Sequence, residues 1–360
     1  LIVTFGEQKA KELYDEYSFF DKEVVYYPSK DVLFYQSDIR GNLLTAERIR
    51  ALKAIREQER VTLVTTFDAL MNTMAPIEKM WENVLTLEQG QLLDLKEIQA
   101  ALIRMGYEKE YQVQTMGQFS VRGGILDVFP LTEENPIRIE LWGDEIDTIR
   151  YFDCESQKSI ENIDRVSIYP AAELVLSDEE KAGGIEKLKA EAKRVSDKLR
   201  KQMKTEEAHR VTVMADELTE EWGELSMYAG MDAFLSYFFD ERVGLLDYFK
   251  PSDSLIFFDE LTRCTEQGKL TETEFSESMK QRLAMGYILP GQMNGLFTEK
   301  EIVAKLEKYS CIALGALDNK ANGLHQLGSY GIHCQSVSPY NNSFELLIKD
   351  LKRYKKNGYR

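Results

Sequence analysis

Apolar and polar side chains alternate strictly between residues 137 and 142. The two sets are Ile137, Ile139 and Leu141 on one side and Arg138, Glu140 and Trp142 on the other. Because successive strand residues point to opposite faces, the segment is predicted to be a strand whose aliphatic face is buried. Trp142 then lies on the polar face, level with Arg138 and Glu140. A large aromatic beside an arginine on a solvated face is typical of a protein–protein hot spot. The alternative is that another part of the chain covers Trp142.

The first 84 residues alternate between short β-rich runs and helical patterns. Strands are predicted at 1–4, 24–27 and 61–65, and helices at 8–17, 45–57 and from 66 to 71. Thr45, with Arg48 three residues later, would give the second helix only half a capping box. Strands separated by helices predict a parallel sheet that is covered on both faces.

Residues 85–175 change character and predict a mainly antiparallel domain inserted into the α/β domain. An amphipathic helix is expected at 92–105, ending at Gly106 as a C′ glycine. Turn signals, among them Gly123-Gly124 and Gly143-Asp144, separate the strand-like runs that follow. These runs are 112–116, 119–121, 125–129, 137–142, 146–152 and 166–169.

The remainder of the chain begins with a charged helix, predicted at 185–203. Its narrow apolar stripe consists of Ile185, Leu188, Ala192, Val195, Leu199 and Met203. Such a stripe on a solvated rod favours a connector that leans on one groove. The α/β patterning is expected to resume with the run 211–214. Further strands are predicted at 254–258, 311–314 and 332–337, and a helix at 344–356.

Composition narrows the class of protein. The 360 residues carry a formal net charge of −16 and are 43% hydrophobic, which is enough for real cores and argues against disorder. So acidic a chain is a poor stand-alone binder of nucleic acid and favours basic or mixed-charge protein partners. No apolar run approaches membrane-spanning length, so no membrane association is expected. The four scattered cysteines predict reduced thiols in a cytoplasmic protein, and His333-Cys334 is only a weak metal candidate.

One segment has features of a nucleotide hydrolase. Residues 254–260 look like a Walker B strand that ends in Asp259 and Glu260, an acidic pair that would hold magnesium. The phosphate-binding pattern G-x-x-x-x-G-K-[ST] occurs nowhere in the 360 residues, although a first strand and its loop could lie upstream of Leu1. We therefore expect no ATP hydrolysis by this chain, and we expect no other catalytic set. The opening strand and the helix stop at Gly358 predict a fragment of a longer polypeptide.

Residues 119–157 closely resemble domain 2 of the bacterial transcription-repair coupling factors (Mfd). That domain is similar to the domain of UvrB that binds UvrA, and a weaker resemblance to the amino-terminal UvrB-homology module covers the whole chain. The resemblance implies a degenerate RecA/helicase-like parallel-sheet domain with an inserted α+β domain. Domain 1A would begin in residues 1–84, domain 2 would span 85–175, 176–338 would complete domain 1A and add domain 1B, and 339–360 would begin the next domain.

The resemblance also implies a function, which is to recruit UvrA to lesion-stalled transcription complexes in nucleotide excision repair. The family's contact with UvrA falls on Arg122, Arg138 and an aromatic four residues later, here Trp142 where phenylalanine is usual; Glu140 shares their face. Polymerase binding, double-stranded DNA binding and an ATP- and magnesium-dependent translocase would belong to later domains, so no cofactor is expected here. In the intact protein a carboxy-terminal domain would mask domain 2.

The relative UvrB supplies the alternative hypothesis. UvrB grips damaged DNA with a long aromatic hairpin, and residues 28–44 are too few for such a hairpin and its connections, which favours the coupling factor. The alternative is a UvrB-like, ATP-dependent enzyme that processes damaged DNA and whose phosphate loop lies outside these residues.

Overall fold

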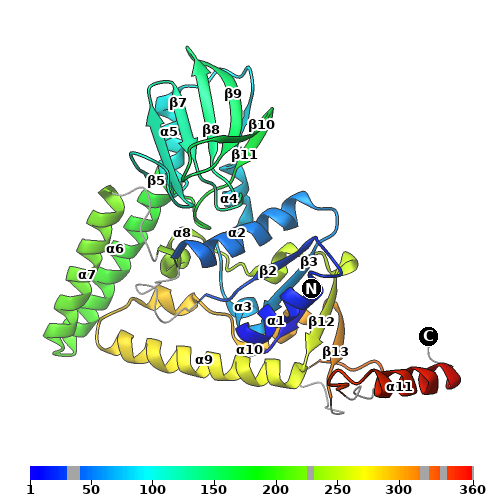
Figure 1. Cartoon of the computed structure of the whole chain (residues 1–360). Helices are drawn as coiled ribbons and strands as arrows, with labels where there is room; N and C mark the ends of the chain where they lie inside the picture. Colours follow the sequence, from blue (N-terminus) through cyan, green and yellow to red (C-terminus); the bar gives the residue numbers. More distant parts are fainter. Residues whose placement is uncertain (31–40, 225–230, 317–323, 333–338, 359–360) are drawn as a thin grey trace. The chain divides into compact units, whose positions relative to one another are not determined.

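The computed structural model describes residues 1–30, 41–224, 231–316, 324–332 and 339–358 (Figure 1). Most of the connection 28–44, nearly all of the predicted strand 332–337 and the His333-Cys334 pair lie outside the described residues. The chain divides into two compact units, Leu1–Leu324 and His325–Arg360, which are described separately.

The first unit contains a five-stranded parallel sheet. Its strands are β1 (Ile2–Thr4), β2 (Val24–Tyr27), β3 (Thr62–Thr66), β12 (Leu255–Asp259) and β13 (Ser310–Leu314). They lie in the order β13-β12-β1-β3-β2, and every neighbouring pair is parallel. The predicted α/β class with a parallel sheet is confirmed.

Helices cover both faces of this sheet because strand residues on each face are apolar. On one face α1 (Glu7–Tyr17) places Ala10 against Val24 and Val64. The other face packs against α2 (Gly41–Glu57), α3 (Phe67–Met71) and α9 (Leu261–Ala284). Helix α2 begins four residues before the predicted start, so the half capping box at Thr45 was wrong; Arg48 is fully buried and pairs with a residue far away in the sequence.

A buried ion cluster joins the parallel-sheet domain to the carboxyl-terminal end of the inserted segment. The guanidinium of Arg48 donates from Nε to Glu173 Oε1 at 2.7 Å and from Nη2 to Glu173 Oε2 at 3.0 Å, and it lies 4.1 Å from the centre of the Tyr27 ring. Lys30 pairs with the same carboxylate at 3.0 Å and with Asp232 at 2.5 Å. Burial raises the pKa of the Glu173 carboxyl, but the charges of Arg48 and Lys30 outweigh this and lower it to about 2.

The inserted segment forms a six-stranded sheet in the order β10-β9-β8-β7-β6-β5. Its strands are β5 (Glu108–Lys109), β6 (Gln118–Arg122), β7 (Ile125–Val128), β8 (Ile137–Trp142), β9 (Glu145–Phe152) and β10 (Ser159–Ile163). All neighbours are antiparallel except β5 and β6. The first and last strands of the segment, β4 (Leu85–Glu88) and β11 (Arg165–Ile168), pair with each other in a separate antiparallel ribbon. The expected inserted α+β domain is confirmed.

One face of the six-stranded sheet forms the core of this domain. Its aliphatic residues pack with Leu102 of α5 (Leu95–Arg104) and with Leu87 and Ile168 of the two-stranded ribbon. Helix α5 begins after the N-cap Asp94 and ends before Gly106, whose φ of +90° confirms the predicted C′ glycine.

The strand predicted at 112–116 was wrong, and these residues form an irregular loop that ends in a turn. Val113 is almost fully buried, so the apolar signal came from a loop that packs into the core. The side chain of Gln118 accepts hydrogen bonds from the amides of Gln114 and Thr115 at 3.0 and 3.1 Å, which satisfies backbone donors that a strand partner would otherwise take.

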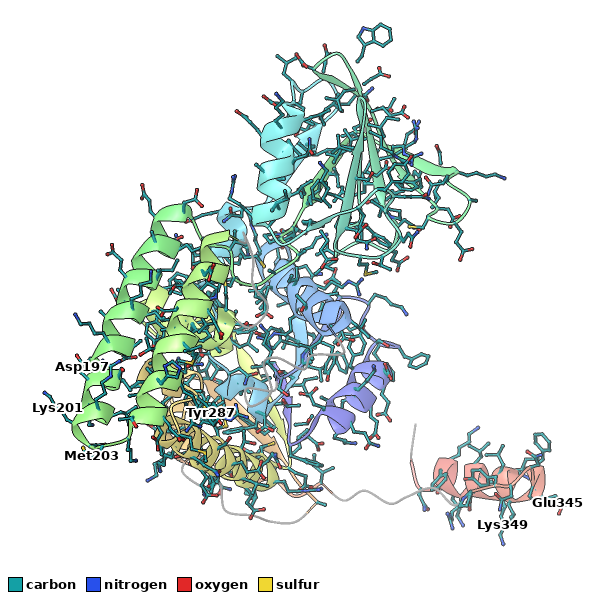
Figure 2. The ribbon with its side chains drawn as sticks, turned by 90° about the vertical axis from the view of Figure 1, so that its left-hand side faces the viewer. Asp197, Lys201, Met203, Tyr287, Glu345 and Lys349 are labelled. Carbon is teal, nitrogen blue, oxygen red and sulfur yellow. The ribbon has the colours of Figure 1, made fainter. Side chains whose placement is uncertain are left out.

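Two long helices, α6 (Asp178–Lys201) and α7 (Thr205–Glu224), pack against each other. The run 211–214 therefore belongs to a helix, and its reading as α/β patterning was wrong. Val211 and Trp222 of α7 are fully buried in one cluster with Leu188 of α6. The apolar stripe of α6 therefore packs against α7. The stripe ends before Met203, which is 87% exposed beyond the helix end; Figure 2 shows Asp197, Lys201 and Met203 at this outer end of the helix pair.

The remaining elements are short apart from the helix of the second unit. They are α4 (Ile77–Glu82), α8 (Leu235–Phe238), α10 (Glu299–Leu306) and 3₁₀ turns at Met231–Phe234, Leu245–Tyr248, Pro251–Asp253 and Pro290–Asn294. The second unit contains α11 (Phe344–Lys356), which matches its predicted bounds. Across the described ranges, no helix combines the length and the apolar character needed to cross a bilayer.

Candidate protein-interaction surface

Strand β8 has the two faces that its alternating sequence predicts. Ile137 and Ile139 are completely buried, Arg138 and Glu140 are half-buried, and the side chain of Trp142 is 83% exposed. The described part of the chain therefore leaves Trp142 uncovered. An indole in that position presents a large apolar area to water, which is the usual anchor of a protein interface.

Arg122 and Trp142 lie at the same end of the six-stranded sheet. Each is the last residue of its strand, and each is followed by a two-residue turn whose first glycine has positive φ, +61° at Gly123 and +65° at Gly143. Strand β7 lies between β6 and β8. Arg122 on β6 pairs with Ile125 on β7, and Ile125 pairs with Glu140 on β8, so Arg122 and Glu140 lie at the same level of the sheet. With ordinary strand spacings, the Cα atoms of Arg122 and Trp142 are about 12 Å apart.

Asp127 on β7 holds both arginines of the predicted site. Arg138 donates from Nε to Asp127 Oδ1 at 2.7 Å and from Nη2 to Oδ2 at 2.8 Å, and Arg122 donates to the same Oδ2 at 2.9 Å. Arg138 also donates to the side chain of Gln157 at 2.8 Å and lies 4.3 Å from the centre of the Phe152 ring. The structure therefore brings Arg122 and Arg138 together through a carboxylate that the sequence did not single out.

Glu140 is paired within the same face. Its carboxylate accepts from both terminal nitrogens of Arg150 on β9, with one of these contacts at 3.0 Å, and from Thr148 at 3.3 Å. The hydrogen bonds from Arg150 lower the pKa of the Glu140 carboxyl. Glu140 is thus an ordered, charge-balanced member of the surface between Arg122 and Trp142.

Tyr111 is an exposed aromatic on this surface that sequence reasoning missed. Its side chain is 83% exposed, and its ring centre lies 6.0 Å from the guanidinium carbon of Arg122. It precedes the run that was misread as a strand, so no periodic signal marked it. The hydroxyl of Ser120 donates to its carbonyl oxygen at 2.7 Å and fixes the loop beside β6.

Trp142 also forms part of the wall of an open groove at the end of the domain. The groove is lined by Glu88, Gln89, Gly90, Trp142, Glu145, Ile146, Asp147, Asp164 and Arg165. Glu88 and Arg165 form an exposed ion pair at 3.1 Å. In the described ranges no cation lies within ion-pair distance of Glu145, Asp147 or Asp164, so the indole borders an acidic surface.

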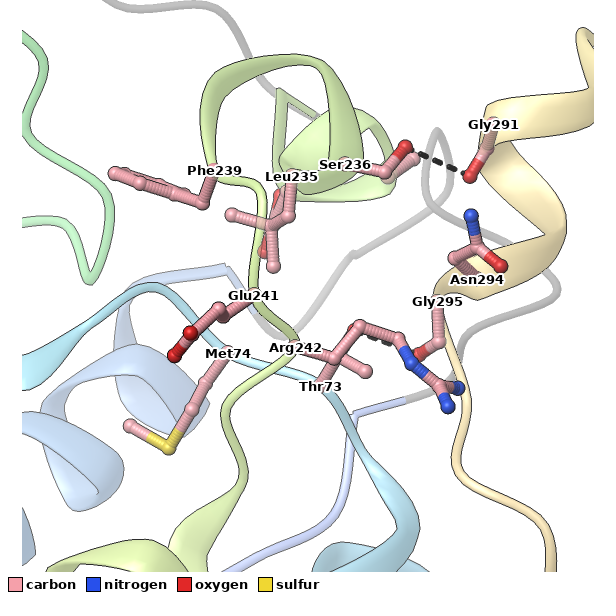
Figure 3. A pocket seen from close by; sticks show the side chains of 12 residues that line it. Thr73, Met74, Leu235, Ser236, Phe239, Glu241, Arg242, Gly291, Asn294 and Gly295 are labelled. Carbon is pink, nitrogen blue, oxygen red and sulfur yellow. Dashed lines mark hydrogen bonds between the residues drawn. The ribbon is translucent and has the colours of Figure 1, made fainter.

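A second, small pocket lies outside the inserted domain and away from Trp142 (Figure 3). Thr73 and Ser236 line it and donate to the carbonyl oxygens of Gly295 and Gly291 at 2.9 and 2.8 Å. Arg242 is held by Leu296 O at 3.3 Å and by the carboxylate of Glu301. These hydrogen bonds occupy the side chains of Thr73, Ser236 and Arg242. Within the residues that the structure describes, no cluster of three His, Cys, Asp or Glu side chains is placed to hold a metal ion.

The predicted Walker B residues lie where parallel strands end. Asp259 is the last residue of β12, and Glu260, with φ of +60°, precedes α9. The carboxylate of Glu260 accepts from the amide of Ala316 at 2.9 Å. Asp259 Oδ2 is buried and has no hydrogen-bond partner among the described residues. The structure thus places both acids at the carboxyl end of the sheet, on the side where α/β proteins bind ligands.

Comparison with known proteins first shows which family the inserted domain resembles. A family model described as the UvrB interaction domain matches residues 85–174, the segment from β4 to just beyond β11. The exposed surface described above therefore lies within a segment similar to a domain with an interaction role.

The whole chain is similar to transcription-repair-coupling factors. It is 26% identical over 360 residues to that of Bacillus subtilis (99% of this chain, 30% of the relative). It is 27% identical over 346 residues to that of Staphylococcus epidermidis RP62A (94% and 28%), and 27% identical over 371 residues to that of Staphylococcus aureus MRSA252 (100% and 30%). The resemblance identified from the sequence is confirmed, and the chain spans about 30% of the length of these curated relatives.

Proposed function

We propose that this chain is a protein-interaction module that binds UvrA through the polar face of its inserted domain. The residues that we assign to this binding site are Arg122, Arg138, Glu140 and Trp142. The single observation that carries the proposal is the uncovered Trp142 at the end of β8, in a segment similar to the UvrB interaction domain. A partner that covers this indole gains the free energy of burying a large aromatic surface, about 2–4 kcal/mol.

The wider role follows from the similarity to transcription-repair-coupling factors. In this proposal the module brings UvrA to transcription complexes that have stalled at DNA lesions, within nucleotide excision repair in the cytoplasm. Contacts with RNA polymerase and double-stranded DNA, and the ATP and magnesium of a translocase, belong to other domains of the longer protein. The module itself acts by binding, without catalysis and without a cofactor.

The test is titration calorimetry of the chain against purified UvrA. The variant Trp142→Ala is compared with Phe20→Ala, which removes an aromatic side chain of similar exposure, 88%, outside the inserted domain. We expect micromolar or tighter binding that Trp142→Ala weakens by about ten-fold or more and that Phe20→Ala leaves unchanged. Equal affinities for the wild type and Trp142→Ala would refute the assigned surface.

The second candidate is a UvrB-like, ATP-dependent DNA-processing enzyme whose phosphate loop lies outside these residues. It is favoured by the position of Asp259 at the carboxyl end of β12 and by its buried oxygen without a hydrogen-bond partner in the described chain. Such an oxygen is available to a magnesium ion. Magnesium-dependent binding of ATP by a longer chain that includes this loop, abolished by Asp259→Asn, would support this candidate; no ATP binding by the longer chain at millimolar magnesium would reject it.

A further inference from the structure

The polar face of the inserted domain is organised around one buried carboxylate. The side chain of Asp127 is only 2% exposed, and it accepts three hydrogen bonds of 2.7 to 2.9 Å from two arginines. The strand register produces this arrangement, because Asp127 lies directly between Ser120 on β6 and Arg138 on β8. Hydrogen bonds between charged groups of this length are strong and fix the orientation of both partners.

The two arginines are held to different degrees. Arg138 makes two bonds to Asp127 and one to Gln157 and lies over the Phe152 ring, and its side chain is only 12% exposed. Arg122 makes a single bond to Asp127, and its side chain is 36% exposed. A guanidinium carries five N–H donors, so most of those of Arg122 remain available to a partner, whereas those of Arg138 are largely used.

The charges on the face indicate which group a partner brings to Arg122. Two guanidinium groups share the single negative charge of Asp127, whereas Glu140 and Arg150 balance each other. The ion pairs of this face thus join three guanidinium groups to two carboxylates and leave one positive charge in excess, within a chain of net charge −16. A planar carboxylate matches the fork of free guanidinium donors, and the exposed Tyr111 ring beside it supplies apolar contact area.

We propose that Asp127 is a positioning residue of this surface, that Arg138 acts on the partner only through Asp127, and that Arg122 with Tyr111 forms the direct contact with a carboxylate of the partner. This inference rests on the proposed function, since UvrA is the partner whose segment would carry the carboxylate. It divides the residues around Asp127 into an internal clamp, made of Asp127 and Arg138, and a contact pair, made of Arg122 and Tyr111; Trp142 remains the apolar anchor of the surface.

Double-mutant cycles with UvrA binding as the readout test this division. Asp127→Asn keeps the shape of the side chain and removes its charge. If it acts by releasing Arg122, we expect it to weaken binding by about ten-fold in the wild type and by less than two-fold in the Arg122→Ala background. A purely structural effect of Asp127→Asn would be the same in both backgrounds, and that result would overturn the proposal.

Two further variants keep the test independent of the folding of Asp127→Asn. Tyr111 is exposed, so Tyr111→Ala leaves the fold intact; we expect a loss of about five-fold in affinity that disappears in the Arg122→Ala background. Arg122→Lys keeps the charge but loses the planar fork, and we expect it to bind nearly as weakly as Arg122→Ala. Full affinity of either single variant overturns the inference.

The cycles also separate the failure of this inference from the failure of the proposed function. If Trp142→Ala weakens UvrA binding while Tyr111→Ala and Arg122→Lys do not, the surface binds UvrA and the division into clamp and contact pair is wrong. If the folded wild-type chain shows no affinity for UvrA, the proposed function is refuted and this inference with it.

Discussion

The buried carboxylate of Glu173 makes stability depend on pH in a predictable direction. Its pKa is lowered from an ordinary value of 4.5 to about 2 in the folded chain, because Arg48 and Lys30 favour the charged form more than burial opposes it. A lowered pKa means that the unfolded chain takes up the proton first. The contribution of Glu173 to stability is therefore complete above about pH 5 and is lost as the pH falls towards 2.

The size of the effect follows from the same values. The difference between 4.5 and about 2 corresponds to about 3 kcal/mol of unfolding free energy. Glu173→Gln removes the charge and leaves Arg48 fully buried beside a neutral partner, so at pH 7 we expect it to destabilise the first unit by about 3–5 kcal/mol. The difference in unfolding free energy between wild type and variant is expected to decrease by about 3 kcal/mol between pH 5 and pH 2.

Urea unfolding followed by circular dichroism at several pH values measures this gap. Glu88→Gln is a matched control, because Glu88 forms an exposed ion pair with Arg165 and its loss is expected to change the unfolding free energy by less than about 1 kcal/mol. Other carboxylates titrate equally in wild type and variant, so the difference between the two curves isolates Glu173. A gap that stays constant from pH 7 to pH 2 would refute the reasoning.

Three further changes test the fold. Trp142→Ala is expected to shift the unfolding free energy by no more than about 0.5 kcal/mol in a thermal melt, because the indole is 83% exposed; a large loss would mean that the residue is part of the core. Trp222→Ala empties the centre of the α6–α7 packing, where the indole is fully buried and lies 5.0 Å from the Phe234 ring, and a loss of about 3–5 kcal/mol is expected in urea titrations. Gly106→Ala is expected to lower the melting temperature, since φ is +90° there and an added Cβ would come within 3.1 Å of the Ala172 side chain; an unchanged melting temperature would contradict this.

Local patterns in the sequence were sufficient to predict much of the fold. The alternation over 137–142 predicts β8 and its two faces, because a strand on the surface of a core requires period two. The helix of the second unit and the C′ glycine at Gly106 follow from equally local signals. The misread run 211–214 has too few residues to separate a strand from one turn of a buried helix.

The candidate site was predictable only in part. Arg138, Glu140 and Trp142 share a strand, so their common face follows from spacing alone. The link from Arg122 to Arg138 through Asp127 depends on the pairing of β6, β7 and β8, and register between strands is not visible in a single sequence. Tyr111 lies in irregular chain, where no period marks a side chain as exposed or buried.

The pairing of β4 with β11 has a consequence for how this domain is built into its host. Leu85 at its start is directly opposite Ile168 at its end, so the chain enters and leaves the domain through neighbouring positions. Opposed residues of an antiparallel pair are only about 5 Å apart, a gap that a short turn closes. The inserted domain therefore interrupts its host at a single position in the chain. Leu131 and Tyr169 of the domain also pack in the core of the parallel-sheet domain, so the domain and its host share part of one core.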